Sequence, residues 1–277
     1  MFDISELGGQ GLRILHSILH LSHLEYVFIY TSHHIISDAW SSSLLFRETL
    51  QVYHDLLQGK PISLPAIKYQ FIDYVNWEIN WFQSAEYARS LKIWRNLIPN
   101  DPEPSRLPSD YTRPPVIKYE GALETATLDA GLVSKIANFS RLENVNVFHT
   151  LLSVFNILLY KYSGDEDIVV GIPLANRNIK EFQNTLGLFL NTLPHKTKLD
   201  VTGTFRDYLL QVKDISQTVI LNQELPFEKL IEEIRPIRDR GISPIFQVLF
   251  VYQNIPSLYD WNGIKLSPEK ADYNISK

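Results

Sequence analysis

The sequence contains no cysteine, which excludes disulfide bonds, thiolate metal sites and a cysteine nucleophile. Its longest apolar runs, such as residues 26–30, are far shorter than the ~20 residues that a membrane-spanning helix needs. It also lacks a basic N-terminal region followed by an apolar core, and it has no cluster of Lys and Arg. We therefore expect a cytoplasmic protein that binds neither a membrane nor nucleic acid.

What the chain does have is enough apolar material for a sizeable core, since 45% of its 277 residues are hydrophobic. Residues 12–21 and 26–32 read as two strands, and the short polar link between them predicts a hairpin. The second strand, YVFIYTS, is apolar on both faces, which predicts a central, buried strand.

Strands and helices are mixed along the whole chain. Apolar residues at helical spacing predict helices at 40–57, 71–82, 86–98, 130–142, 147–162, 204–221 and 227–234. Further strands are predicted at 123–128, 167–173 and 244–252. This mixture indicates an α/β or α+β fold.

A proline-dense stretch interrupts these elements. Six of the fifteen prolines lie between Pro99 and Pro115, where they exclude a helix or a central strand. We interpret residues 99–118 as a connection between an N-terminal subdomain, residues 1–98, and a C-terminal subdomain, residues 119–277.

The segment with the clearest chemical potential is His33-His34-x-x-x-Asp38, which lies between the second predicted strand and a predicted helix. Histidine suits proton transfer because its unperturbed pKa is about 6.5. An α-amine has a pKa of about 7.7–8.0, so such a nucleophile needs no strong base at neutral pH. His34 could accept the proton of an attacking amine, or it could hold the amine and stabilise a charged intermediate. The sequence leaves both roles open.

Other interpretations apply to the same residues. The two histidines could form a partly buried pair in a strand-to-loop turn. A metal site is disfavoured, because neighbouring residues on an extended backbone point in opposite directions, and we expect no metal ion. Asp38 or Ser37 could simply cap the following helix, which is compatible with a chemical role.

Five segments together resemble one family. HHIISDAW, residues 33–40, resembles the HHxxxDG motif of condensation domains of nonribosomal peptide synthetases and of chloramphenicol acetyltransferase-like acyltransferases. Four further segments match condensation domains in the same order: YQFIDYVNWEINW (69–81), LGLFLNTLPHK (186–196), NQELPFEKL (222–230) and RDRGISPIFQVLFVYQN (238–254).

The resemblance implies an architecture and a set of residue roles. Two chloramphenicol acetyltransferase-like subdomains form a V around a substrate tunnel, and the first carries the His-His-Asp loop. His34 is the catalytic residue, while His33 and Asp38 are mainly structural. The residues that the resemblance places along the tunnel are Ala39, Trp40, Ser41 and Asn191.

The implied reaction is amide-bond formation between a donor acyl or peptidyl thioester and an acceptor aminoacyl thioester. Upstream and downstream carrier proteins supply both substrates on phosphopantetheine, so no tightly bound cofactor is expected. The implied partners are these carriers and an adenylation domain. Two alternatives remain: a CoA-dependent acyltransferase of the same fold, and a non-catalytic fragment that only docks carriers.

The chain also departs from the family pattern. Ala39 stands where glycine is usual, which would destabilise the loop if that position needed a positive φ. His195-Lys196 stands where an arginine is common two residues after Pro194. The family's opening segments have no counterpart, and the last strands are not recognisable, so we expect a domain that is partial at both ends. Such a chain would lack the arginine partner of Asp38 and would show little transfer by itself.

Overall fold

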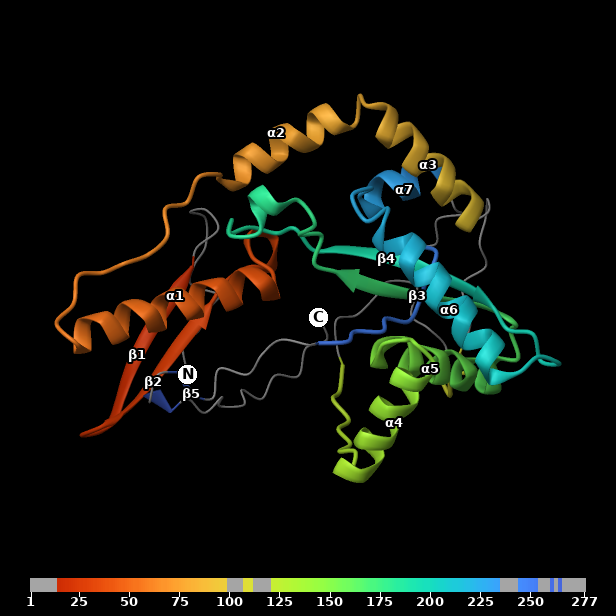
Figure 1. Ribbon diagram of the computed structural model, residues 1–277, viewed down its shortest axis with the longest axis horizontal. Helices are drawn as coiled ribbons and strands as arrows, with labels where there is room; N and C mark the ends of the chain where they lie inside the picture. The colour runs from red at the N-terminus through yellow and green to blue at the C-terminus, as the bar shows by residue number, and fades with distance from the viewer. Residues whose placement is uncertain are drawn as a thin grey trace. The chain divides into compact units, whose positions relative to one another are not determined.

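The computed structural model describes residues 14–98, 107–111, 121–234, 244–253, 260–261 and 264–265. Within these residues the chain forms two compact units. The first contains the described residues up to Asn80 together with Arg177–Leu190, and the second contains Trp81–Asn176 and most of the described chain from Asn191 onward. Strands and helices are mixed along the described chain: a hairpin precedes five α-helices, and a further pair of strands precedes two more α-helices, as Figure 1 shows.

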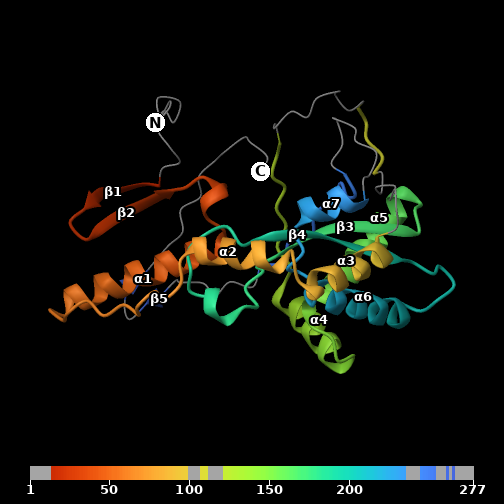
Figure 2. The same cartoon turned by 90° about the horizontal axis from the view of Figure 1, so that it is seen from above.

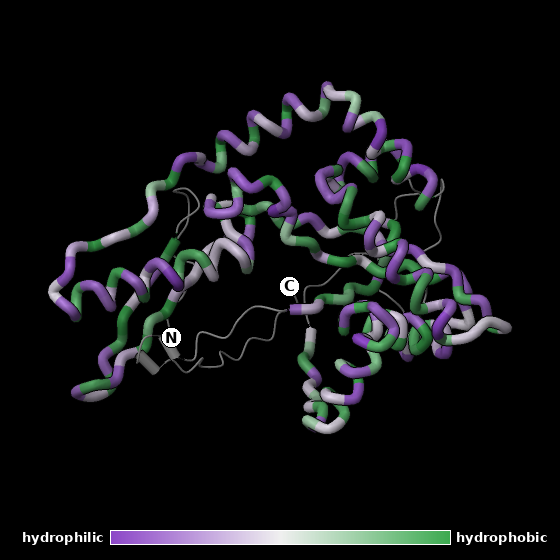
Figure 3. Tube along the Cα trace, viewed as in Figure 1, coloured by the Kyte–Doolittle hydropathy of each residue, from purple (hydrophilic) through white to green (hydrophobic). Residues whose placement is uncertain are grey.

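The first unit begins with the predicted hairpin, formed by β1 (Leu15–Ser22) and β2 (Glu25–Thr31). Much of this hairpin is apolar, as the green stretches of the trace in Figure 3 show, yet its residues are largely exposed, with only Val27 and Tyr30 half-buried on β2. The prediction that β2 is a buried central strand is therefore wrong for this chain. In the described residues β2 pairs with β1 alone, and an apolar strand is buried only where other elements cover it.

Two helices complete the first unit. Helix α1 (Ala39–Leu57) runs beside the hairpin in Figures 1 and 2, and Phe46 on α1 packs edge-on against Phe28 and Tyr30. Helix α2 (Phe71–Trp81) contributes to an aromatic core with residues of the segment 177–190, which contains a short 3₁₀ turn, η3 (Lys180–Phe182). The buried members of this core are Tyr74, Phe182 and Phe189.

The second unit is built around a two-stranded antiparallel sheet, β3 (Asp167–Leu174) and β4 (Asn191–Lys198), with Val170 opposite His195. Its helices are α3 (Ala85–Leu97), α4 (Ala130–Leu142), α5 (Val147–Ser163), α6 (Phe205–Ile220) and α7 (Phe227–Ile234). The seven α-helices that the structure describes agree with the sequence predictions to within two residues at either end.

Strand β3 is apolar on both faces because each face packs against helices. Ile168, Val170 and Ile172 pack with residues of α5 and α6, whereas Val169 belongs to a core with residues of α3 and α7. The continuous apolar run that predicted this strand therefore reflects burial from both sides.

Two predicted strands need correction, and one strand was missed. Residues 123–128 are irregular and exposed, because alternation alone does not make a strand where no partner lies beside it. Residues 244–252 form only a single parallel bridge, between Leu249 and Gly171. Strand β4 was not predicted, since its polar residues and Pro194 are atypical of a buried strand.

The bridge to Gly171 explains the need for glycine there. The Gly171 N–H donates to the carbonyl oxygen of Val248 at 2.8 Å, and the Gly171 carbonyl accepts from the N–H of Phe250 at 2.9 Å. A Cβ atom at residue 171 would lie 2.5 Å from side-chain carbons of Leu249 and Phe246. Glycine therefore permits the close approach of the two segments.

The predicted connection over residues 99–118 lies mostly outside the described residues, so the division of the chain at this segment stays a prediction. A pair of extended two-residue strands, β5 (Asp260–Trp261) and β6 (Ile264–Lys265), follows near the end of the described chain. Of the helices that the structure describes, no single one has the length and hydropathy to cross a membrane; only the pair α4 and α5, bent by 105°, passes these criteria together.

Candidate active site

The two histidines lie in a tight loop between β2 and α1. His33 has an extended backbone, and His34–Ile36 form a 3₁₀ turn, η2. The N–H of Ile35 donates to Nδ1 of His33 at 3.1 Å, so the His33 side chain closes the turn. This bond makes Nδ1 an acceptor and leaves the proton of a neutral ring on Nε2. His33 is thus held by its own loop.

His34 differs sharply from its neighbour. Its side chain is exposed, and its imidazole forms no hydrogen bond with any residue that the structure describes. Both ring nitrogens are therefore available to a substrate. Because His33 is exposed too, the alternative of a partly buried histidine pair does not apply.

Asp38 caps helix α1, as its position just before the helix predicted. The N–H of Ser41 donates to Oδ1 of Asp38 at 2.7 Å, and the N–H of Phe189 donates to Oδ2 at 3.0 Å. The carboxylate is only 4% exposed, so it faces protein rather than solvent. Ser37 does not cap the helix; its hydroxyl lies 3.4 Å from that of Ser42.

An ion pair within the first unit neutralises this buried carboxylate. Nη2 of Arg177 lies 3.4 Å from both oxygens of Asp38, and each side chain is 2% exposed. The guanidinium carbon lies 3.7 Å from the ring centroid of Phe189. The pKa of Arg177 is lowered, because burial disfavours its charged form more than the neighbouring Asp38 carboxylate stabilises it.

Arg177 corrects an expectation from the sequence. The chain was expected to lack the arginine partner of Asp38, together with the opening segments that have no counterpart here. Instead this partner lies 139 residues after Asp38. The signal available in the sequence was chemical: a buried carboxylate needs a partner, and Arg177 follows a buried strand and precedes a family-like segment.

The segment that carries Arg177 is fastened to the start of α1. We call residues 177–190 the crossover segment. The Ser41 hydroxyl donates to the Gly187 carbonyl at 2.7 Å and accepts from the Gly187 N–H at 3.1 Å and from Arg177 Nη2 at 2.7 Å. Nε1 of Trp40, whose side chain is 43% exposed, donates to the Gln183 carbonyl at 2.9 Å.

Ala39 is the first residue of α1 and is not among the described residues with positive φ. The loss of stability that was expected if this position required a positive φ does not arise, because the position is helical.

The structure brings most of the predicted site residues together. His33, His34, Asp38, Ala39, Trp40 and Ser41 all lie in one loop and the first turn of α1. Asn191 belongs to the second unit, where its side chain is buried. Its Nδ2 donates to the carbonyl oxygens of Gln223 and Leu225, both at 2.8 Å, and its Oδ1 accepts from the N–H of Phe227 at 3.2 Å. These bonds hold the Asn191 side-chain amide against the turn between α6 and α7.

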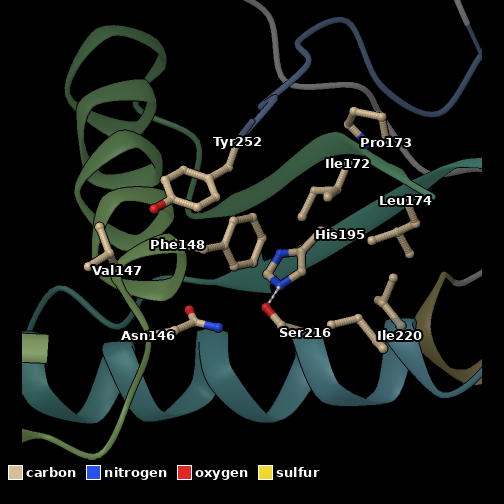
Figure 4. A pocket seen from close by; sticks show the side chains of 11 residues that line it. Asn146, Val147, Phe148, Ile172, Pro173, Leu174, His195, Ser216, Ile220 and Tyr252 are labelled. Atoms are coloured by element: carbon tan, nitrogen blue, oxygen red, sulfur yellow. Dashed lines mark hydrogen bonds between the residues drawn. The ribbon is translucent and has the colours of Figure 1, made fainter. Parts of the chain in front are cut away.

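The second unit also contains a cavity of about 490 Å³, which Figure 4 shows from close by. The imidazole of His195 lies among its lining side chains, with Nε2 3.0 Å from the Ser216 hydroxyl. Burial lowers the pKa of His195 to about 4, so this ring is neutral near pH 7. Apolar side chains dominate the lining, which also includes Asn146. The neighbouring Lys196 forms an ion pair with Asp167 at 3.1 Å.

No group of three or more His, Asp or Glu side chains that could hold a metal ion occurs within the described part of the chain. The loop presents two exposed imidazoles, of which that of His33 is bonded to the Ile35 N–H and that of His34 forms no hydrogen bond with the described residues.

Comparison with known proteins now identifies the fold. The model of the condensation domain matches residues 10–277. The chain belongs to the condensation-domain family. It is 39% identical over 240 residues to a linear gramicidin synthase of Brevibacillus parabrevis, covering 87% of this chain and 3% of that protein. It is 34% identical over 254 residues to gramicidin S synthase 2 of Brevibacillus brevis, covering 91% of this chain and 6% of that protein.

Solved structures agree with this assignment. The four-domain nonribosomal peptide synthetase AB3403, bound to AMP and glycine, matches with a TM-score of 0.74 and 25% identity, over 86% of this chain and 18% of that chain. The X-domain from teicoplanin biosynthesis matches with a TM-score of 0.74 and 24% identity, over 85% and 54% of the two chains. The predicted mixed α/β fold of the chloramphenicol acetyltransferase-like type is confirmed. The chain spans only 3% and 6% of the length of the two gramicidin synthases that it matches.

Proposed function

We propose that this chain catalyses amide-bond formation between two thioesters carried on phosphopantetheine. The acceptor amine attacks the carbonyl carbon of the donor thioester, the C–N bond forms and the C–S bond breaks. The amine loses one proton, and the departing sulfur gains one. His34 is the group that holds the amine or transfers this proton.

The observation that carries the proposal is the contrast within the loop. The His33 ring closes the turn and the Asp38 carboxylate anchors the helix, whereas the His34 imidazole is exposed and has no partner in the described residues. A catalytic group must be free to meet substrate while its backbone is held in place. His34 alone among the three meets both conditions.

The other predicted tunnel residues take different roles in this proposal. Ala39 and Trp40 follow His34 by five and six residues in the sequence. Both are exposed and are suited to contact substrate. Ser41 and Asn191 are buried, with their polar groups bonded to protein, so they act by holding the backbone.

The partners follow from the reaction and from the names of the relatives. Upstream and downstream carrier proteins would present the substrates on phosphopantetheine, and an adenylation domain would load them. The relatives are gramicidin synthases, and one structural neighbour is a multidomain synthetase. We further propose a cytoplasmic location, the division into residues 1–98 and 119–277, and the V-shaped arrangement implied by the family.

A carrier-to-carrier transfer assay tests the function. Donor and acceptor carriers are loaded, mixed with a fusion that supplies the opening segments of a related condensation domain, and examined by mass spectrometry. Formation of the dipeptidyl carrier is the expected result, with its loss in His34→Ala but not in His33→Asn, whose Oδ1 can replace Nδ1 as the acceptor for the Ile35 N–H. Carrier binding without transfer by the folded wild-type fusion would contradict the enzyme proposal and favour a docking module. Transfer from CoA thioesters alone would favour a CoA-dependent acyltransferase.

A further inference from the structure

The crossover segment links the two units through the chain itself. Asn176 ends a stretch of the second unit, residues 177–190 belong to the first, and Asn191 returns to the second. The two ends of the segment thus leave and re-enter the sheet formed by β3 and β4.

A single glutamine bonds to both ends of this segment. The N–H of Asn176 donates to the side-chain oxygen Oε1 of Gln223 at 3.2 Å. Nδ2 of Asn191 donates to the main-chain carbonyl oxygen of Gln223 at 2.8 Å. Nε2 of Gln223 donates to the Ile220 carbonyl at 2.8 Å, which fixes the side chain on the end of α6. Gln223 is 8% exposed, so these bonds are sheltered from water.

The backbone at the first end is also unusual. Asn176 has a φ of 51°, in the left-handed region where asparagine is one of the few tolerated non-glycine residues. This conformation turns the chain out of the direction of β3. The hydrogen bond from its N–H to Gln223 helps to hold a turn that is not favoured by itself.

In the sequence, the two fixed ends are one or two residues away from the groups that hold Asp38. Arg177 follows Asn176 directly, and its guanidinium pairs with the Asp38 carboxylate. Phe189 precedes Asn191 by two residues, and its N–H donates to the same carboxylate. Little chain is therefore available to absorb a movement at either end before it reaches Asp38.

We propose that Gln223 is a positioning residue for the amide-forming reaction: by fixing both ends of the crossover segment, it sets where Arg177 and Phe189 meet Asp38. Asp38 in turn fixes the start of α1 and the loop that presents His34. Gln223 is not a catalytic residue, and its role in the reaction rests on the proposed function.

Two isosteric variants separate the contacts of Gln223. Gln223→Met keeps the length and the apolar volume but removes both the acceptor for Asn176 and the donor to Ile220, while the main-chain carbonyl still accepts from Asn191. Gln223→Glu keeps this acceptor and loses the donor to Ile220. Gln217→Ala is the matched control, because Gln217 is exposed on α6 and has no side-chain hydrogen bond in the described residues.

Amide hydrogen exchange of the 277-residue chain tests the positioning itself, whatever the reaction. In Gln223→Met, exchange at Asn176, whose N–H loses its acceptor, should rise about fivefold, the change expected from one hydrogen bond. Exchange at Phe189 and Ser41, whose N–H groups donate to Asp38, should rise with it. Amides in the middle of α5 should stay unchanged. Gln223→Glu should restore most of the protection at Phe189, and Gln217→Ala should match the wild type. Unchanged exchange at Phe189 in Gln223→Met, or an equal rise in α5, would overturn the inference.

Transfer kinetics in the fusion test the consequence for the reaction. Gln223→Met should lower kcat about tenfold with little change in KM for either carrier, because a displaced catalytic group affects the chemical step. A normal kcat together with raised exchange at Phe189 would overturn the positioning role while leaving the proposed function intact. Absence of transfer in the wild-type fusion would contradict the proposed function; the exchange result would then stand as a structural coupling only.

Discussion

The two units of this chain bury polar groups in different ways. The first buries a charged pair, Asp38 and Arg177, whose side chains are both 2% exposed. The second buries neutral groups, the His195 imidazole and the Asn191 amide. Among the ion pairs between described residues, that of Asp38 and Arg177 is the only one in which both side chains are shielded from solvent.

The difference follows from the number of hydrogen-bond partners that a charged and a neutral buried side chain need. A buried carboxylate needs several donors, and Asp38 obtains them from Ser41, Phe189 and Arg177, which belong to two distant stretches of sequence. This ties a loop to a crossover segment in one defined geometry. A buried neutral group needs only one or two partners and is suited to a core that changes little. The buried ion pair thus lies beside the candidate catalytic loop.

The largest expected effect is on catalysis in the first unit. His34→Ala should reduce carrier-to-carrier transfer about 10²–10⁴-fold, the usual contribution of a positioned acid–base group. Because the side chain is exposed, the thermal midpoint should change little. The measurements are mass-spectrometric transfer assays in the fusion and thermal melts. A folded His34→Ala protein with near-normal transfer would remove His34 from the mechanism.

The next effect concerns the buried pair. Arg177→Met leaves the Asp38 charge without its cation and should lower the free energy of unfolding by about 3–5 kcal/mol. Arg95→Met is the control, because Arg95 and Glu233 form an exposed pair whose loss should cost no more than about 1 kcal/mol. Urea denaturation of both variants measures the difference.

A double variant sharpens this test. Asp38→Asn combined with Arg177→Met removes both charges, so it should recover part of the stability lost in Arg177→Met alone. If Arg177→Met were as stable as Arg95→Met, the buried pair would not hold the first unit together, and the contrast between the two units would fail.

The neutral core of the second unit predicts a pH dependence. Burial lowers the pKa of His195 from its ordinary 6.5 to about 4, so the unfolded chain binds a proton more readily than the folded one between these values. The free energy of unfolding should therefore be fully present above pH 6.5 and decline as the pH falls toward 4, by roughly 3 kcal/mol for this residue.

A comparison of the wild type with one variant isolates this effect. Burial also lowers the pKa of His149, and carboxylates titrate at the lower end of the range, so the wild type alone is ambiguous. In His195→Leu the decline from about pH 6.5 to about pH 4.5 should be shallower than in the wild type, as measured by urea denaturation at each pH. Parallel curves for the two proteins would show that His195 is not kept neutral by folding.

Local patterns predicted much of the fold. The spacing of apolar residues gave helix α1 within one residue, and Asp38 at its start was recognised as a cap. The apolar run of residues 167–173 gave strand β3. These features depend on neighbouring residues, whose chemistry is visible in the sequence.

Features that depend on distant partners were missed. The partner of Asp38 lies in the crossover segment, and the role of Gln223 depends on bonds to Asn176 and Asn191. Residues 123–128 alternate as a strand does, yet lack a neighbour with which to pair among the described residues. Alternation reports which side chains are apolar, and it carries no information about which segment lies alongside.

The residues of the candidate site were predicted mainly from the family motif and only partly from the physical properties of the side chains. The family resemblance singled out His34 and grouped Ser41 with the tunnel residues. The structure gives the Ser41 hydroxyl hydrogen bonds to Gly187 and Arg177, which no pattern around residue 41 indicates.

The smallest expected effect is at Ala39, where the family usually has glycine. Ala39 is the first helical residue after the Asp38 cap and needs no positive φ, so alanine is the better residue for the helix. Ala39→Gly should lower the free energy of unfolding by about 0.5–1 kcal/mol, because glycine loses more backbone entropy on folding. Its side chain is exposed, so no core packing offsets this loss. Urea denaturation beside Ala130→Gly, at the same position of α4, measures whether the loss is typical of a first helical residue. A more stable Ala39→Gly protein would mean that the loop prefers a conformation in which glycine is favoured, and the fixed geometry ascribed to the first unit would be wrong at its starting point.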